Sequence, residues 1–117
     1  MMKKMDRKAL TLQREIERIK KELVGLGDLR PGSLSKQYNV CGKPGCRCKA
    51  SPPVKHGPYY QVSYTRRGRS GSMFVRGGQV TQVRQQLKNY SKLRKLVDRW
   101  IEAAAELSNL RLGQERG

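Results

Sequence analysis

Two apolar stripes, one near each end of the chain, constrain the fold most. Each alternates spacings of four and three residues, which places its side chains on one face of an α-helix, as in a coiled-coil seam. The first stripe is Leu12, Ile16, Ile19, Leu23 and Leu26. The second is Leu93, Val97, Trp100, Ala104 and Leu107. The sequence therefore predicts helices over residues 6–24 and 79–110, with a break expected near Asn89, Tyr90 and Ser91.

Both stripes need a partner surface. The two ends of the chain can pack on each other as an antiparallel pair, or each can pack on a second copy in a homodimer. The periodicity does not choose between these arrangements. Beyond the second helix, residues 113–117 are expected to form a disordered tail.

Between the stripes, glycine, proline and tyrosine replace the helical pattern. Residues 33–40 predict a short strand, and residues 58–65 alternate Tyr60, Val62 and Tyr64 on one face, as in a half-buried strand. Residues 66–69 form a turn into a further strand at 72–76. The predicted fold is α+β. A zinc loop and a small β-hairpin or sheet (29–78) lie between an N-terminal amphipathic helix (1–28) and a C-terminal helical tract (79–112).

The positive charge is concentrated in the centre of the chain. The 117 residues include 26 Lys or Arg and 9 Asp or Glu, for a formal net charge of +17, but no acidic residue lies between positions 29 and 97. A segment of one sign repels itself, and a polyanionic partner relieves that repulsion. A disordered basic tail would also be rich in cations, but it would lack the strand pattern and the metal ligands found here.

One cluster of metal-ligand residues lies inside this basic segment. The stretch VCGKPGCRCKASPPVKH spaces Cys41, Cys46, Cys48 and His56 as C-x4-C-x-C-x7-H. Thiolates and an imidazole suit a tetrahedral structural Zn²⁺, and the neighbouring lysines and arginines favour the thiolate form. Two alternatives stay open, namely reduced cysteines without a metal and an iron–sulfur cluster, which would indicate a redox sensor. His56 is the weakest of the four ligands, because HGP also fits a turn before a strand.

The same composition argues against an enzyme and against a membrane protein. A closed zinc site offers no open position, and the basic segment holds one histidine and no carboxylate, so it lacks a general base and a two-metal site. There is no apolar run of 18 residues and no signal-peptide pattern after MMKK. An odd number of cysteines fits a reducing compartment. The expected location is the cytoplasm, in association with the nucleoid or a ribonucleoprotein.

The exposed cations indicate nucleic acid, either DNA or RNA, as the partner. Arg66, Arg67 and Arg69 are expected at a hairpin tip that could enter a minor groove or clamp phosphates. Helical spacing brings Arg84, Lys88, Lys92 and Lys95 to one helix face. The remaining expected phosphate contacts are Lys36, Lys43, Arg47, Lys49, Lys55 and Arg76. Four aromatic residues are expected either to stack on bases or to fill the small core. They are Tyr59, Tyr60, Tyr64 and Phe74.

Three segments resemble a family of short, uncharacterised bacterial and phage-borne proteins. These are CGKPGCRC, HGPYYQVSY with its arginine-rich turn, and the LKNYSKLRKL helix at residues 87–96. The likeness covers about residues 31–110 and implies the same zinc-type module, often encoded near transposases and integrases, but no assigned activity. The hairpin followed by a helix also looks like the arm-binding domains of tyrosine recombinases, which lay a sheet on DNA.

The function expected from these features is that of a zinc-stabilised nucleic-acid-binding protein. It would act as an accessory factor of a mobile element, with a transposase or integrase as its protein partner, or as a component of a ribonucleoprotein. The alternative from a different class is a homo-oligomeric coiled-coil scaffold that binds protein partners. The iron–sulfur sensor is the third hypothesis.

Overall fold

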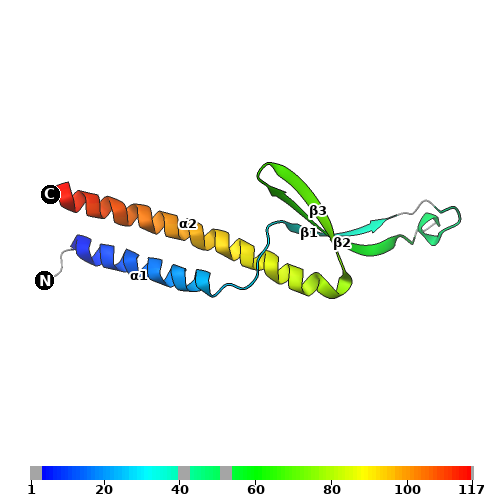
Figure 1. Cartoon of the computed structure of the whole chain (residues 1–117), viewed down its shortest axis with the longest axis horizontal. Coiled ribbons are helices and arrows are strands. Elements are labelled where there is room, and N and C mark those ends of the chain that lie inside the picture. Colours follow the sequence, from blue (N-terminus) through cyan, green and yellow to red (C-terminus); the bar gives the residue numbers. More distant parts are fainter. Residues whose placement is uncertain (1–3, 40–42, 51–53, 117) are drawn as a thin grey trace. The chain divides into compact units, whose positions relative to one another are not determined.

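The chain has the expected α+β fold, with an N-terminal helix, a three-stranded antiparallel sheet and a long C-terminal helix. The computed structural model describes residues 4–39, 43–50 and 54–116. Its elements are α1 (Lys4–Val24), β1 (Ser33–Asn39), η1 (Arg47–Lys49), β2 (His56–Arg66), β3 (Arg69–Val75), η2 (Gly77–Gln79) and α2 (Val80–Arg116). Figure 1 labels the two α-helices and the three strands. They make two compact units. The helical unit is Met1–Asp28 with Asn89–Gly117, and the sheet unit is Leu29–Lys88.

The helical unit is an antiparallel pair built from the two ends of the chain. Leu12 and Ile16 of α1 pack against Ala103 and Leu107 of α2, and Figure 1 shows the two helices side by side. Of the two arrangements that the sequence left open, the structure therefore shows the packing of the two ends of the chain on each other. Exposed ion pairs flank the seam, as between Lys8 and Glu106 (2.7 Å). Such pairs contribute at most about 1 kcal/mol each, so the apolar seam provides most of the stability.

The predicted stripe on α2 is confirmed at Trp100, Ala104 and Leu107, which pack in the seam with α1, but not at Val97. Leu96 and Ala103 are buried at 2% and 5% exposure, whereas Val97 is 36% exposed. Leu96 lies four residues before Trp100 and Val97 lies three residues before it, and both spacings fit one helix face, so periodicity alone cannot distinguish them. Which of these neighbouring residues is buried depends on the side of α2 that packs against the rest of the helical unit.

Two further expectations about α2 were wrong. The helix continues without a break through residues 89–91. Asn89 donates its side-chain amide to the Asp28 carbonyl (2.8 Å), so this side chain does not compete for the backbone of its own helix. The helix also extends to Arg116, through the tail expected from residue 113. Gly113 within this tail costs about 1 kcal/mol relative to alanine, which a long helix tolerates.

The sheet unit contains three antiparallel strands in the order β1-β2-β3. A two-residue turn joins β2 to β3. Arg67 (φ 53°) and Gly68 (φ 75°) both have positive φ, as a type I′ hairpin turn requires. Because only two residues form the turn, β2 and β3 extend to Arg66 and Arg69, which lie directly opposite each other.

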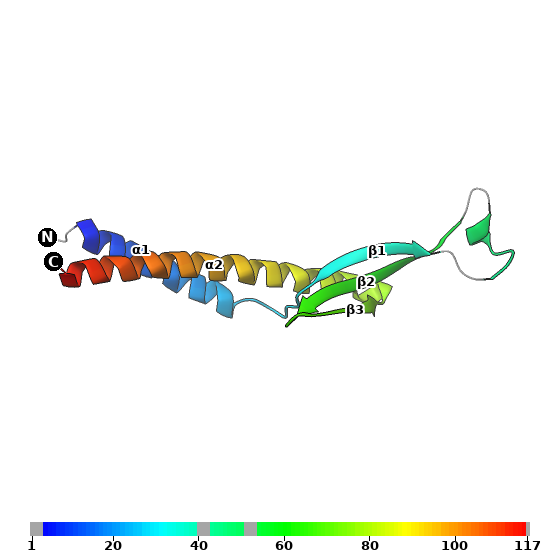
Figure 2. The same cartoon turned by 90° about the horizontal axis from the view of Figure 1, so that it is seen from above.

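The first turns of α2 cover one face of the sheet. Val62 is fully buried, and with Val75 it packs against Val80 and Val83 of α2; Figure 2 shows the start of α2 next to these strands. Half-buried side chains, including that of Leu34, surround this cluster. Complete burial of a valine or leucine side chain is worth about 1.5–3 kcal/mol, so this small cluster holds the sheet on the helix. No helix among the described residues is long and apolar enough to cross a membrane.

Candidate metal centre and basic surface

Three of the four predicted metal ligands come together in the loop between β1 and β2. The ligand atoms of Cys46, Cys48 and His56 all lie within 4.8 Å of one another. The Sγ atom of Cys46 is 3.2 Å from Nε2 of His56. The fourth predicted ligand, Cys41, lies outside the described residues. The structure therefore supports a three-residue cluster of one imidazole and two sulfur groups.

Local backbone geometry positions this cluster. A turn with Gly45 at φ 75° leads to Cys46, and the amide of Lys49 donates to the Cys46 carbonyl (3.0 Å), which forms the short helix η1 around Cys48. The amide of Val54 donates back to Arg47 (2.9 Å) and closes the loop. These backbone hydrogen bonds hold the two cysteines in a tight knuckle.

The β1–β2 ladder brings the histidine to the cysteines. His56 is the first residue of β2 and pairs with Asn39 at the end of β1. Gly57 follows with φ 136°, and a Cβ atom there would lie 2.8 Å from the carbonyl oxygen of Gln37. Only glycine fits both this backbone conformation and this close approach. The HG pair of the HGPYY segment thus sets the position of the imidazole.

The chemistry of this cluster fits a structural zinc ion. Cys48 is 1% exposed, and its sulfur lies next to the ligand atoms of Cys46 and His56. A tetrahedral zinc with Zn–S of about 2.3 Å and Zn–N of about 2.0 Å keeps its ligand atoms roughly 3.5 Å apart. The separation of 3.2 Å between Cys46 Sγ and His56 Nε2 is close to that value, and all three ligand atoms lie within 4.8 Å of one another. Sulfur and imidazole nitrogen are the donors that zinc prefers in structural sites.

The two units also differ in their content of basic and acidic residues. The sheet unit contains twelve Lys or Arg residues and no Asp or Glu. The helical unit contains fourteen basic residues and all nine acidic ones, and its ion pairs include Arg99 with Glu15. The cations of the helical unit are therefore largely compensated, while those of the sheet unit have no acidic residue within their own unit.

All thirteen cations expected to contact phosphates are exposed, in several groups. The metal loop carries Lys43, Arg47, Lys49 and Lys55, and the hairpin tip carries Arg66, Arg67 and Arg69. Lys36 lies on β1, Arg76 follows β3, and Arg84 and Lys88 lie on the first turns of α2. Lys92 and Lys95 belong to the helical unit. The structure thus places eleven of the thirteen in one compact unit.

A cation that the residue patterns did not single out lies near the hairpin tip. Arg30 lines a pocket of about 320 Å³ together with Arg66 and Tyr64. Its Nε atom is buried without a hydrogen-bond partner, and its Nη1 atom is 2.9 Å from Sδ of Met73. No local motif marks this residue, because it acquires its surroundings only through the fold. Two guanidinium groups in one pocket provide an anion-binding environment.

The aromatic residues take different roles in the structure. Tyr60 packs against the buried cluster of the sheet, and the ring of Tyr64 covers Gly71, where an added Cβ would lie 2.7 Å from the ring. Tyr59 is 42% exposed and Phe74 is 73% exposed. Among the aromatic residues described in the sheet, these last two alternate with Tyr60 and Val75 and therefore lie on the face opposite α2.

Comparisons with known proteins identify one family. The model of a domain of unknown function, DUF6788, matches residues 10–85. This range begins inside α1 and ends in the first turns of α2, so it includes the whole sheet unit up to residue 85 and leaves out the LKNYSKLRKL segment. Searches of curated proteins and of solved structures find no match to the chain.

Proposed function

Because the chain belongs to DUF6788, a family described as a domain of unknown function, we propose from its own residues that it is a zinc-stabilised nucleic-acid-binding protein. The observation that carries this proposal is the separation of charge between the two units. Twelve cations and no carboxylate lie in the 60 residues of the sheet unit. A phosphate backbone is the polyanion that such a surface attracts.

The hairpin tip supports the proposal in detail. Arg66 and Arg69 lie directly opposite each other in the ladder, and Arg67 occupies the turn between them. Like charges in directly opposite positions destabilise a sheet, and the sheet unit has no acidic residue to offset this cost. Bound phosphates would relieve the repulsion, since guanidinium groups bind them with bidentate geometry.

The metal site supports a structural role for zinc in this proposal. A zinc ion held by Cys46, Cys48 and His56, with Cys41 as the proposed fourth ligand, would fix a loop that carries four exposed cations. A site with four protein ligands has no open position for a reacting water. We therefore propose a binding protein and not an enzyme, located in the cytoplasm as an accessory factor of a mobile element or a ribonucleoprotein.

One observation favours a second candidate function, that of a homo-oligomeric scaffold. Val97, Ile101 and Leu112 share one face of α2 and are 36%, 61% and 51% exposed. An apolar stripe of this kind fits a second copy of the helical unit. This role can coexist with nucleic-acid binding, because the stripe and the cation-rich sheet belong to different units.

A pair of matched triple variants tests the proposal. Arg66, Arg67 and Arg69 are replaced together by alanine in one protein, and the exposed Arg7, Arg14 and Arg18 of α1 in the other. Both variants lose three charges. We expect the hairpin variant to bind DNA and RNA oligonucleotides more weakly in fluorescence polarisation, with a salt dependence shallower by about one unit of slope per lost contact. Equal weakening in both variants would show that only total charge matters.

A further inference from the structure

The face of the sheet opposite α2 has a composition unlike that of the rest of the sheet unit. Val62 and Val75 point toward α2, and side chains alternate between faces along each strand. The opposite face, here called the open face, therefore consists of the intervening residues and contains no charged side chain. They are Ser33, Ser35 and Gln37 of β1, Tyr59, Gln61, Ser63 and Thr65 of β2, and Ser70, Ser72 and Phe74 of β3.

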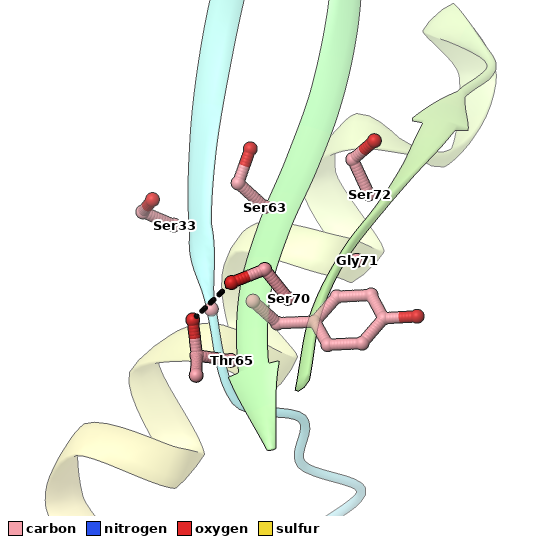
Figure 3. A pocket seen from close by; sticks show the side chains of 8 residues that line it. Ser33, Ser63, Thr65, Ser70, Gly71 and Ser72 are labelled. Carbon is pink, nitrogen blue, oxygen red and sulfur yellow. Dashed lines mark hydrogen bonds between the residues drawn. The ribbon is translucent and has the colours of Figure 1, made fainter. Parts of the chain in front are cut away.

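Small hydroxyl side chains line one end of the open face. Ser33, Ser63 and Ser72 occupy directly opposite positions on the three strands, and Thr65 and Ser70 are joined by a hydrogen bond of 3.1 Å. Together they border an open pocket of about 570 Å³ (Figure 3). Hydroxyl groups both donate and accept hydrogen bonds, and their small size lets a ligand approach the strands closely.

Two exposed rings lie toward the other end of the open face. Phe74 is directly opposite Gln61, and Tyr59 is two residues from Gln61 on the same strand and face. The two rings are therefore diagonal neighbours, a separation that aromatic side chains bridge. Phe74 is 73% exposed, so its ring is accessible to a ligand.

Two groups of cations of the sheet unit lie beyond the ends of the open face. Arg66, Arg67 and Arg69 are at the hairpin tip, beyond Thr65 and Ser70, while the metal loop with Lys55 precedes the start of β2. β2 is 11 residues long, or about 37 Å at about 3.4 Å per residue. A strand of nucleic acid along β2 would place its bases on an uncharged surface and its phosphates within reach of cations at either end.

We propose that the open face binds single-stranded nucleic acid, with bases stacked on Phe74 and Tyr59. This inference rests on the proposed function and assigns that function a contact surface. Stacking on exposed rings requires unpaired bases, which favours a single strand over a duplex. Gln37 and Gln61 lie beside the rings, and their amides can pair with base edges. Water can form hydrogen bonds with the serine hydroxyl groups of this face. It offers no comparable contact to the faces of the two exposed rings.

Leucine substitutions test the stacking directly, because leucine keeps apolar area but has no π face. The double variant Phe74→Leu with Tyr59→Leu is compared with Tyr38→Leu. Tyr38 is also exposed, at 49%, but it lies on the other face of the sheet. There the Nζ atom of Lys36 is 5.7 Å from the centre of the Tyr38 ring. We expect the double variant to bind a 12-nucleotide single strand about tenfold or more weakly. The Tyr38 variant should bind like wild type, and both variants should melt within a few degrees of it.

The outcomes separate the inference from the proposed function. If wild-type protein binds the single strand and the double variant binds it equally well, the open face is not the contact surface, whereas the charge-based proposal stands. If wild-type protein binds neither single strands nor duplexes, both proposals fail. Ultraviolet crosslinking of wild-type protein to an oligonucleotide with 5-bromouridine adds a test without substitutions. A crosslinked peptide with Phe74 or Tyr59 supports the inference, and crosslinks confined to other peptides contradict it.

Discussion

The Sγ atom of Cys46 and the Nε2 atom of His56 lie 3.2 Å apart because the β1–β2 ladder closes the loop between them. His56 begins β2 opposite the last residue of β1, and the knuckle around Cys48 turns the cysteines back toward it. The metal site and the sheet are therefore coupled, since the pairing of two strands sets the distance between the ligands.

This coupling predicts that the loss of one ligand destabilises the sheet unit. Cys46→Ser should remove about one zinc per chain, measured by elemental analysis, and lower the free energy of unfolding by more than about 4 kcal/mol, as is typical for loss of a structural metal. Lys49→Ala, in the same loop but with an exposed side chain that is not a ligand, should retain the metal and the stability.

Two results would contradict a zinc site. A metal-free wild-type protein that melts at the same temperature with and without a chelator would show that the cysteines have no structural metal. A brown protein with iron and sulfide would indicate the iron–sulfur cluster instead.

The glycine after His56 provides a second, independent test. Gly57→Ala should strain the backbone at φ 136° and push the new Cβ against the Gln37 carbonyl at 2.8 Å, which separates the ends of β1 and β2. We expect weaker zinc binding and a loss of about 1–3 kcal/mol of stability. Gly78→Ala, where an added Cβ meets nothing within 4 Å, is the matched control and should melt like wild type. Unchanged zinc affinity in the Gly57 variant would uncouple the strand register from the metal site.

The helical unit yields a prediction about packing and assembly. Leu107→Ala removes a side chain that is 6% exposed in the seam with α1, and it should cost about 2–5 kcal/mol. Ile101→Ala changes a side chain that is 61% exposed and should cost less than about 0.5 kcal/mol in a monomer. If chemical denaturation shows a large loss for Ile101→Ala that depends on protein concentration, the exposed stripe is a subunit interface.

Much of the fold follows from local patterns. The 4-3 spacing of Leu12, Ile16 and Ile19 predicted α1, and the alternation around Val62 predicted β2, because each pattern matches the period of its element. The buried stripe of α2 could not be fixed in this way. Leu96 and Val97 both satisfy the spacing, but only Leu96 is buried in the folded chain.

Part of the candidate site could also be predicted from local sequence patterns. The spacing of Cys46, Cys48 and His56 indicated the metal cluster, because these ligands are close in sequence. Arg30 was not singled out and Phe74 was not assigned to a face, since the surroundings of each residue depend on strand register across the sheet. The positions of acidic residues marked the boundary at Asp28, and this is also where the compact units divide.

The most direct test of the account is the affinity of the wild-type protein for a DNA or RNA oligonucleotide, measured between about 50 and 200 mM salt. If six or more of the twelve cations of the sheet unit contact phosphates, the affinity should fall by about a hundredfold or more over this range, because each contact releases counterions. An affinity that is immeasurably weak at 50 mM salt, or that stays constant across the range, would contradict the proposal that this protein binds nucleic acid through its sheet unit.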